Sequence, residues 1–249
     1  MDTYVMTIPR TVPKRALKVM IDVNDCKKWI IGKETGKNGY EHWQVRLQTS
    51  NGEFFMWIKQ HIPTAHVEQS TADWSYSYEA KEGKHWKDND TNEVLIQRFG
   101  KLTDRQKGVI KALGRTNDRE IVCWVDLEGN HGKSWLIGHL WETGQAHVCQ
   151  SQDTVKGMVQ DIASDYIKHG WRPIVVIDLP RTWKWTTDLY CAIERIKDGL
   201  IKDTRYSSST INIKGIKVLV CTNSYPKLDK LSEDRWVLIV ERGGRAPFS

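Results

Sequence analysis

The chain has 249 residues, of which 39% are hydrophobic and 27% charged, and its formal net charge at pH 7 is +6. This composition is typical of a globular protein with one large or two small domains, and no apolar run approaches the length that crosses a membrane. Five widely spaced cysteines without a CxxC pair argue against a disulfide framework or a zinc cluster. The first ten residues lack the layout of a signal peptide, so we expect an intracellular protein that does not enter membranes.

Short strand patterns separated by turn residues open the chain. Tyr4–Ile8 predicts a strand that stops at Pro9, and residues 14–21 fit either a helix or a strand. Trp29–Gly32 predicts a buried strand, and the glycine-rich stretch Lys33–Gly39 predicts a turn after it. The elements of this part of the chain are therefore short.

The next segments suggest a sheet with helices beside it. Residues 42–48 alternate between polar and apolar, which predicts a strand with 42, 44, 46 and 48 on one face. Glu53–Ile58 either continues the sheet or opens a helix, and residues 73–82 predict a helix. Together these patterns indicate an α+β domain built on an antiparallel sheet over 1–92.

After a polar loop at Asn89–Asn92, the predicted elements change to helices and buried strands that alternate along the chain. Leu102–Leu113 predicts a helix capped near Thr103, and we expect residues 93–118 to form a linker or an oligomerisation element. Ile121–Val125 predicts a buried strand, and Ser134–Trp141 predicts the helix after it.

The strand and helix patterns continue to alternate toward the C-terminus. Thr154–Lys168 predicts a helix, and residues 173–178 and 218–223 predict buried strands of a parallel sheet. We therefore expect an α/β domain over 119–249, with a disordered tail at Gly243–Ser249.

Three polar residues of the first domain form a candidate metal site. His42 and Gln44 lie two apart on a predicted strand and project from one face, and Glu34 lies across the preceding turn. One imidazole nitrogen and two kinds of oxygen suit Mg²⁺ or Mn²⁺ better than Zn²⁺. Such an ion would act as a Lewis acid on a phosphate oxygen.

Tyr78 and Lys81 form a candidate nucleophilic pair. They lie three apart, which on a helix places them on one face. A tyrosine hydroxyl is a poor nucleophile near neutral pH unless a cation assists it, and Lys81 would supply that cation. Tyr76 is a rival, but Glu79 stands three residues after it where a lysine would be needed.

A glycine-rich stretch between the strand at 121–125 and the helix at 134–141 has the residue types of a phosphate-binding loop. Backbone N–H groups would hold phosphates, Lys133 would counter their charge and Ser134 would hold Mg²⁺. The pattern departs from GxxxxGKS because Leu127 stands in place of the first glycine. The loop that we expect to bind ATP comprises Gly129, Asn130, His131, Gly132, Lys133 and Ser134.

Asp178 ends the predicted strand at 173–178 and fits an acid that holds Mg²⁺ through water. A second acid often follows such a residue, but Leu179 follows here. The base that would activate water therefore remains unassigned.

The motifs of the first domain resemble the HUH endonuclease domain of Rep proteins from circular single-stranded DNA viruses. The matching stretches are Val5–Arg10, His42-Trp43-Gln44 with Glu34, and Tyr78–Gly83. The sequence of Gly39–Leu47 resembles that of smacovirus Reps. The resemblance implies a metal site at Glu34, His42 and Gln44, a nucleophile at Tyr78 and DNA contacts at Arg10.

The motifs of the second domain resemble those of superfamily-3 helicases. The resemblance implies that Asn223 is the sensor asparagine, that Arg235 is an arginine finger acting across a subunit interface, and that Lys214 belongs to a DNA-contacting hairpin.

Together the resemblances imply a rolling-circle replication initiator. It would nick an origin stem-loop in single-stranded DNA through a 5′-phosphotyrosine, rejoin the ends, and move on DNA as an ATP-driven hexamer. Host replication proteins would be its partners, in the nucleus if the host is eukaryotic. Two alternatives stay open: a plasmid or transposon nickase, and a nucleic-acid-binding ATPase that does not nick.

Overall fold

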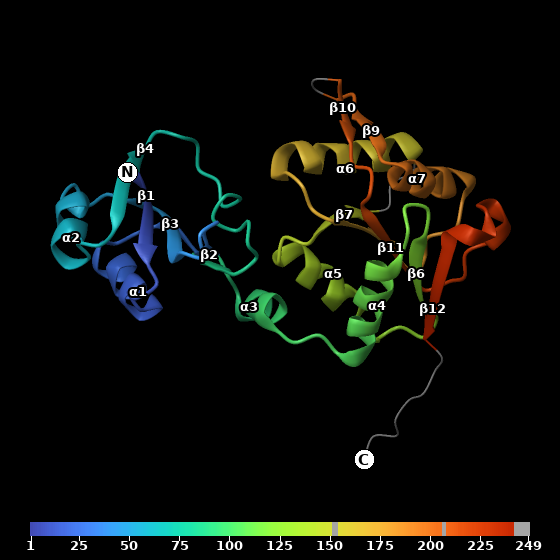
Figure 1. Ribbon diagram of the computed structural model, residues 1–249, viewed down its shortest axis with the longest axis horizontal. Helices are drawn as coiled ribbons and strands as arrows, with labels where there is room; N and C mark the ends of the chain where they lie inside the picture. The colour runs from blue at the N-terminus through green and yellow to red at the C-terminus, as the bar shows by residue number, and fades with distance from the viewer. Residues whose placement is uncertain (151–153, 206–207, 242–249) are drawn as a thin grey trace, which may run out of the picture. The chain divides into compact units, whose positions relative to one another are not determined.

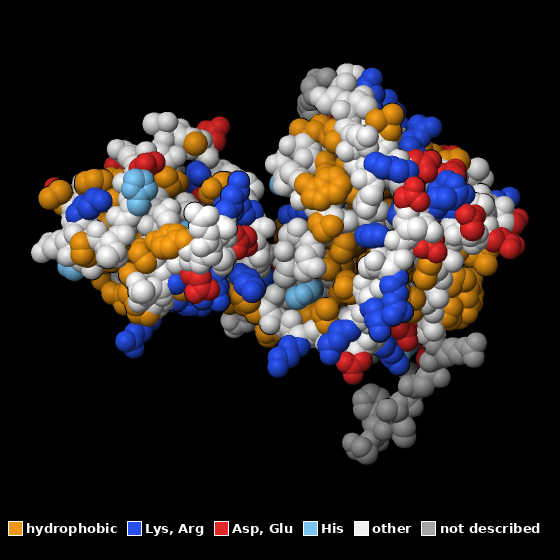
Figure 2. Space-filling view, viewed as in Figure 1, with side chains coloured by type: hydrophobic (Ala, Val, Ile, Leu, Met, Phe, Trp, Pro, Cys, Tyr) orange, Lys and Arg blue, Asp and Glu red, His pale blue; other side chains and the backbone are white. Residues whose placement is uncertain are grey.

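The computed structural model describes residues 1–150, 154–205 and 208–241. The chain divides into two compact units, Met1–Gly100 with Glu142–Gly144, and Lys101–Trp141 with Gln145–Ser249. Figure 1 labels most of their helices and strands, and Figure 2 shows their surface with the side chains coloured by type. The expected disorder at Gly243–Ser249 lies outside the described residues. No helix in the described ranges is both long enough and apolar enough to span a bilayer.

The first unit is built on a five-stranded antiparallel sheet in the order β4-β1-β3-β2-β5. Alternate residues of the central strands are buried, and they pack with apolar residues of the first two helices into one core. The elements are β1 (Asp2–Pro9), α1 (Lys14–Val23), β2 (Lys28–Thr35), β3 (Glu41–Thr49), α2 (Phe54–His61), β4 (His66–Ser70), β5 (His85–Lys87) and α3 (Asn92–Phe99). The antiparallel α+β architecture predicted for this part of the chain is confirmed.

Two ambiguous segments of the first unit are helices. Residues 14–21 lie in α1, whose Leu17, Met20 and Ile21 are buried at helical spacing. Residues 54–58 begin α2, which buries Phe54 and Ile58. In each case the spacing of the apolar residues matches burial along one face of a helix.

The turn predicted over Lys33–Gly39 begins later than expected. Lys33, Glu34 and Thr35 still belong to β2, where they pair with Trp43, His42 and Glu41 of β3. The turn is therefore confined to residues 36–40. This longer hairpin places Glu34 directly opposite His42.

The helix predicted over 73–82 is wrong: this segment forms a succession of turns. The backbone N–H of Ala80 donates to Tyr76 O at 3.1 Å, and that of Gly83 donates to Ala80 O at 2.9 Å. The Ser75 hydroxyl accepts from the backbone N–H of Ser77, which competes with helical hydrogen bonding. Local turn hydrogen bonds therefore replace the predicted helix over this segment.

The second unit contains a five-stranded parallel sheet in the order β12-β6-β11-β8-β7. One face of the sheet packs against α6 and α7, and the other against α4 and α5. The elements are α4 (Asp104–Arg115), β6 (Ile121–Asp126), α5 (Lys133–Glu142), β7 (Ala146–Gln150), α6 (Val155–His169), β8 (Ile174–Asp178), α7 (Thr187–Asp198), β11 (Lys217–Thr222) and β12 (Trp236–Glu241). The predicted parallel α/β sheet is confirmed.

A small hairpin and two short 3-10 helices complete the second unit. The hairpin pairs β9 (Leu200–Asp203) with β10 (Ser209–Asn212), and the short helices are η1 (Leu228–Lys230) and η2 (Glu233–Arg235).

The expected linker over 93–118 is divided between the two units. Helix α3 clusters with the first unit, whereas α4 belongs to the second. Val109 and Leu113 of α4 are buried against the sheet, and a Thr103 capping box begins the helix as predicted. Helix α4 is therefore part of a core rather than a free connection.

Candidate active sites

Strand pairing in the first unit brings the predicted metal ligands together. Glu34 of β2 pairs with His42 of β3, and Gly32 pairs with Gln44, so all three predicted ligands project from one face of the sheet. His42 Nε2 lies 3.7 Å from Glu34 Oε2. His42 Nδ1 lies 3.1 Å from Tyr40 O, a contact that orients the ring with Nε2 toward Glu34.

The surroundings of Glu34 fit a divalent cation. Its side chain is buried, and Oε1 has no hydrogen-bond partner among the described residues. A buried carboxylate oxygen without a partner is costly unless a cation or water meets it. The third ligand, Gln44 Oε1, accepts from Thr7 Oγ1 at 3.0 Å and keeps a second lone pair. No three His, Cys, Asp or Glu side chains among the described residues are grouped so that they could hold a metal ion, so the donor set here includes the amide of Gln44.

Lys81 lies between the candidate ligands and the candidate nucleophile. Its Nζ lies 2.7 Å from Glu34 Oε2 and 3.6 Å from the centroid of the Tyr78 ring. Burial would lower the pKa of Lys81, but hydrogen bonds to Glu34 and Tyr78 outweigh burial and raise it. The lysine therefore stays charged beside the tyrosine, although the pair lies on a turn rather than on a helix.

The two tyrosines differ in their surroundings. Tyr76 Oη donates to Asp88 at 2.9 and 3.2 Å, and burial followed by the Asp88 hydrogen bond raises the pKa of Tyr76. The side chain of Tyr78 is 56% exposed. Tyr78 is therefore open to an incoming substrate, whereas the hydroxyl of Tyr76 is held within the unit.

A buried ion pair that the sequence reasoning missed anchors the turn that carries Tyr78. Arg46 Nε of β3 donates to Glu79 Oε1 at 3.0 Å, and the Glu79 side chain is fully buried. At Gly32 the turn approaches β2 so closely that a Cβ would meet the Glu79 carbonyl, whose carbon would lie 3.1 Å away. Arg46 shares a strand face with His42 and Gln44, and that spacing was the signal in the sequence.

The predicted DNA contact Arg10 lies at the end of the same sheet. Its Nη1 lies 2.7 Å from Glu41 Oε1, and its guanidinium lies 5.9 Å from the centroid of the Trp43 ring. The first unit therefore brings its predicted ligands, nucleophile and lysine together, with Arg10 paired to a neighbouring acid.

In the second unit, the glycine-rich loop connects β6 to α5 with an unusual backbone. Gly129, Asn130 and Gly132 have φ values of 84°, 66° and 83°, in the left-handed region that favours glycine and tolerates asparagine. Lys133 and Ser134 begin α5, so the N–H groups at the end of the loop are free of intrahelical bonding. The predicted loop thus opens a helix at the end of a buried strand.

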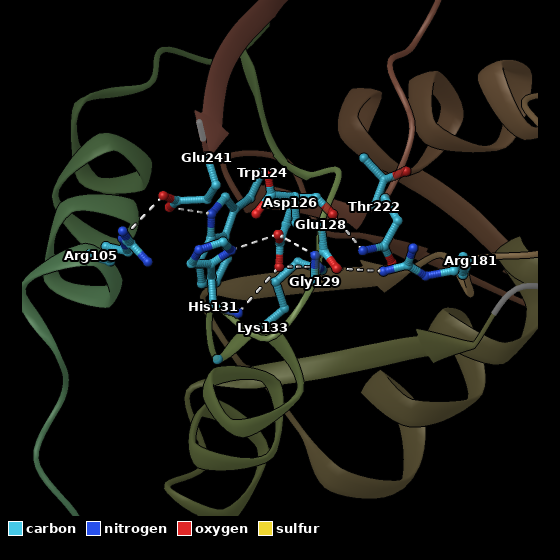
Figure 3. Close-up of polar contacts among 12 residues, drawn as sticks. Arg105, Trp124, Asp126, Glu128, Gly129, His131, Lys133, Arg181, Thr222 and Glu241 are labelled. Atoms are coloured by element: carbon cyan, nitrogen blue, oxygen red, sulfur yellow. Dashed lines mark hydrogen bonds and ion pairs between the residues drawn. The ribbon is translucent and has the colours of Figure 1, made fainter. Parts of the chain in front are cut away.

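Asp126, the last residue of β6, lies under this loop (Figure 3) and is fully buried. Lys133 Nζ donates to its Oδ2 at 2.8 Å, the Gly129 N–H donates to Oδ1 at 2.8 Å, and His131 Nδ1 lies 2.7 Å from Oδ1. Burial would raise the pKa of Asp126, but the bonds from Lys133, His131 and Gly129 lower it to about 2. The sequence reasoning missed this residue, whose signal is an acid ending an apolar strand.

The other predicted nucleotide residues lie at the ends of the neighbouring strands. Asp178 of β8 pairs with Cys221 of β11, and burial raises the pKa of Asp178. The side chain of Asn223, just after β11, donates to Asp126 O. Leu179, which stands where a second acid would follow Asp178, is buried and has no carboxylate to activate water. These strand ends converge on the loop because the sheet is parallel.

Arg235, predicted to be an arginine finger acting across a subunit interface, forms ion pairs within its own unit. Only 7% of the residue is exposed, and its guanidinium lies 3.1 Å from Glu194 and 3.3 Å from Asp198 of α7. Both acids belong to its own unit, so the ion pairs satisfy the guanidinium locally. Lys214 follows the β9–β10 hairpin, and its Nζ lies 3.6 Å from Asp118 on the surface.

Comparisons relate part of the chain to replication proteins. No protein-family model matches it. The master replication protein of subterranean clover stunt virus (strain F) is 28% identical over 133 residues, which is 52% of this chain and 43% of the relative. That of faba bean necrotic yellows virus (isolate Syrian SV292-88) is 29% identical over 135 residues, 53% and 43% of the two chains.

An alphasatellite protein and a solved structure are also similar to parts of the chain. Para-Rep C10 of the milk vetch dwarf C10 alphasatellite is 30% identical over 138 residues, 54% of this chain and 46% of the relative. A formyltetrahydrofolate deformylase structure from Pseudomonas putida KT2440 covers 77% of the chain at 9% identity with a TM-score of 0.22, too low to bear on the fold. The chain spans about half the length of the replication proteins that it matches, and the similarity covers about half of its own residues.

Proposed function

We propose that this chain is a rolling-circle replication initiator that nicks and rejoins single-stranded origin DNA and hydrolyses ATP. One observation carries the nicking half: Lys81 joins an exposed Tyr78 to Glu34, which pairs with His42 and keeps a partnerless buried oxygen. The similarity to viral master replication proteins supports the same reading.

Tyr78 would act as the nucleophile on a phosphodiester. Its oxygen forms a bond to phosphorus while the bond from phosphorus to the 3′-oxygen breaks, and that oxygen leaves with a proton as a free 3′-hydroxyl. The product is a 5′-phosphotyrosine, and attack by a 3′-hydroxyl in the reverse direction rejoins the strand. Lys81 would stabilise the negative charge that develops on the tyrosine oxygen.

Glu34, His42 and Gln44 would hold Mg²⁺ or Mn²⁺. Such an ion polarises a non-bridging phosphate oxygen and offsets the charge that accumulates on the phosphate during attack. The sheet keeps the three side chains on one face, and the Arg46–Glu79 pair keeps the Tyr78 turn beside them.

A labelled origin stem-loop oligonucleotide with Mn²⁺ tests the nicking half. We expect a covalent protein–DNA adduct that survives denaturing electrophoresis and disappears in Tyr78→Phe. Tyr76→Phe is the matched control and should retain the adduct, because its hydroxyl is bound to Asp88. An adduct that persists in Tyr78→Phe contradicts the assignment, and no adduct from any variant supports a binding ATPase without nicking.

The second unit would bind ATP at the loop between β6 and α5. Lys133 would meet the phosphates, Ser134 and Asp178 would hold Mg²⁺, and Asn223 would orient the attacking water. Lys133→Ala should abolish ATP turnover while Lys184→Ala, a change at an exposed lysine, should not. ATP turnover that survives Lys133→Ala removes the phosphate-loop assignment.

The proposal extends to assembly and location. The ATP-driven unit would work as a homo-hexamer on single-stranded DNA. Lys214 would lie near the DNA, and Arg10 would contact the origin. Host replication proteins would extend the free 3′-hydroxyl, in the nucleus where the host is eukaryotic. Mass photometry with ATP and single-stranded DNA tests the hexamer, and a monomer under those conditions contradicts it.

A further inference from the structure

Arg181 lies against the loop between β6 and α5. Its Nη2 donates to Glu128 O at 2.9 Å, and a Cβ built on Gly129 would lie only 2.7 Å from the same nitrogen. Gly129 is therefore the residue that gives the guanidinium room beside the loop. In Figure 3, Arg181 reaches the loop from the side opposite to His131 and Lys133.

Two side chains from different strand ends converge at Gly129. The point at which a Gly129 Cβ would lie is 2.7 Å from Arg181 Nη2 and 3.9 Å from Asn223 Nδ2. Arg181 follows β8 by three residues and Asn223 follows β11 directly, and these two strands are neighbours in the sheet. Two donor groups thus lie on one side of the loop, near the strand end that carries Asp178.

Arg181 differs from Lys133 and Arg235 in that its guanidinium contacts a neutral group rather than an acid. Lys133 meets the Asp126 carboxylate, whereas Arg235 precedes β12 at the other end of the sheet, where it pairs with Glu194 and Asp198. Arg181 is exposed and meets a neutral backbone carbonyl, a weaker partner for a guanidinium than an anion. A phosphate arriving at the loop would offer this guanidinium a charge-assisted, bidentate partner.

We propose that Arg181 is the catalytic arginine of ATP hydrolysis and that it acts in cis, within the chain that holds the nucleotide. The inference rests on the proposed ATPase function. Arg181 would leave Glu128 O and contact the terminal phosphate, where negative charge is redistributed as the bond to the leaving oxygen breaks. Lys133 would contact the phosphates from the other side of the loop.

The test compares Arg181→Ala and Arg181→Lys with Lys184→Ala, an exposed cation of the same segment, in the full chain. Turnover at saturating Mg·ATP should fall by about 100-fold or more in Arg181→Ala, as for other arginines at a transferred phosphate. Arg181→Lys should recover only part of the rate, because lysine lacks the planar fork. Mg·ADP affinity should stay within about twofold, because the terminal phosphate is absent from ADP.

The outcomes separate this inference from the function on which it rests. Wild-type turnover that Lys133→Ala abolishes and Arg181→Ala leaves intact would overturn only the role of Arg181. A wild-type chain without ATP turnover would remove the ATPase proposal itself. Recovery of turnover in a mixture of Lys133→Ala and Arg181→Ala chains would overturn the assignment in cis, because it requires one chain to supply the arginine to another.

Discussion

Asp126→Asn is expected to destabilise the nucleotide-free protein and to tighten nucleotide binding. The carboxylate lies fully buried under the loop and contacts Lys133, His131 and the Gly129 N–H. Removing its charge leaves the Lys133 ammonium, whose side chain is 11% exposed, without its counter-charge. The same change frees Lys133 to meet phosphate.

The magnitude follows from the pKa of Asp126, which falls from its ordinary value of 3.8 to about 2. A carboxyl with a lowered folded-state pKa stabilises the fold above its unfolded pKa, and the contribution is lost as the pH falls from about 4 to about 2. At about 1.4 kcal/mol per pH unit, the contribution at neutral pH is about 2.5 kcal/mol. Removing one partner of a buried pair costs about 3–5 kcal/mol, a similar size.

Urea unfolding at pH 7 and titration with a fluorescent ADP analogue measure the two effects. We expect the free energy of unfolding to fall by about 2–4 kcal/mol and the analogue to bind several-fold tighter. Glu128→Gln is the control, because that acid is exposed and Arg181 contacts its backbone carbonyl, which the change leaves in place. Weaker binding in Asp126→Asn would refute the reasoning, since it would mean that the carboxylate shapes the loop rather than competing with phosphate.

Three further changes test the anchoring of the nucleophile and the pH dependence. Gly32→Ala should reduce adduct formation by about tenfold or more, because the added Cβ would displace the Glu79 backbone and with it Tyr78. A small displacement of a reacting group slows the reaction strongly. An adduct yield equal to that of the wild type would contradict this. Arg46→Met should lower the free energy of unfolding by about 3 kcal/mol by leaving the Glu79 carboxylate buried and unpaired, whereas Arg46→Met with Glu79→Leu should recover most of it in urea titrations. His147, whose pKa burial lowers from 6.5 to about 4, binds its proton more readily when unfolded, so stability should fall as the pH drops from about 7 to 4. That slope should shrink in His147→Gln, and an unchanged slope would exclude His147 as its source.

Much of the fold could be predicted from the sequence because hydrophobic periodicity reports burial directly. The strand at 42–48 and the helix that begins after Thr103 appear where alternation and capping residues placed them. The unbroken apolar run at 121–125 predicted a strand covered on both faces, and residues of β6 pack alternately into two cores. The helix prediction for 73–82 was wrong because the residues of this segment show no comparable hydrophobic periodicity.

The spacing of motifs in the sequence was enough to predict most of the side chains of each candidate site. Only the tertiary structure decided their partners: Lys81 with Glu34, Asp126 with Lys133, and Arg181 with Glu128. The first pair joins a turn to a strand, the second crosses a left-handed loop, and the third joins two strand ends. Contacts of this kind depend on register and loop geometry, which long-range packing sets and which hydrophobic periodicity does not encode.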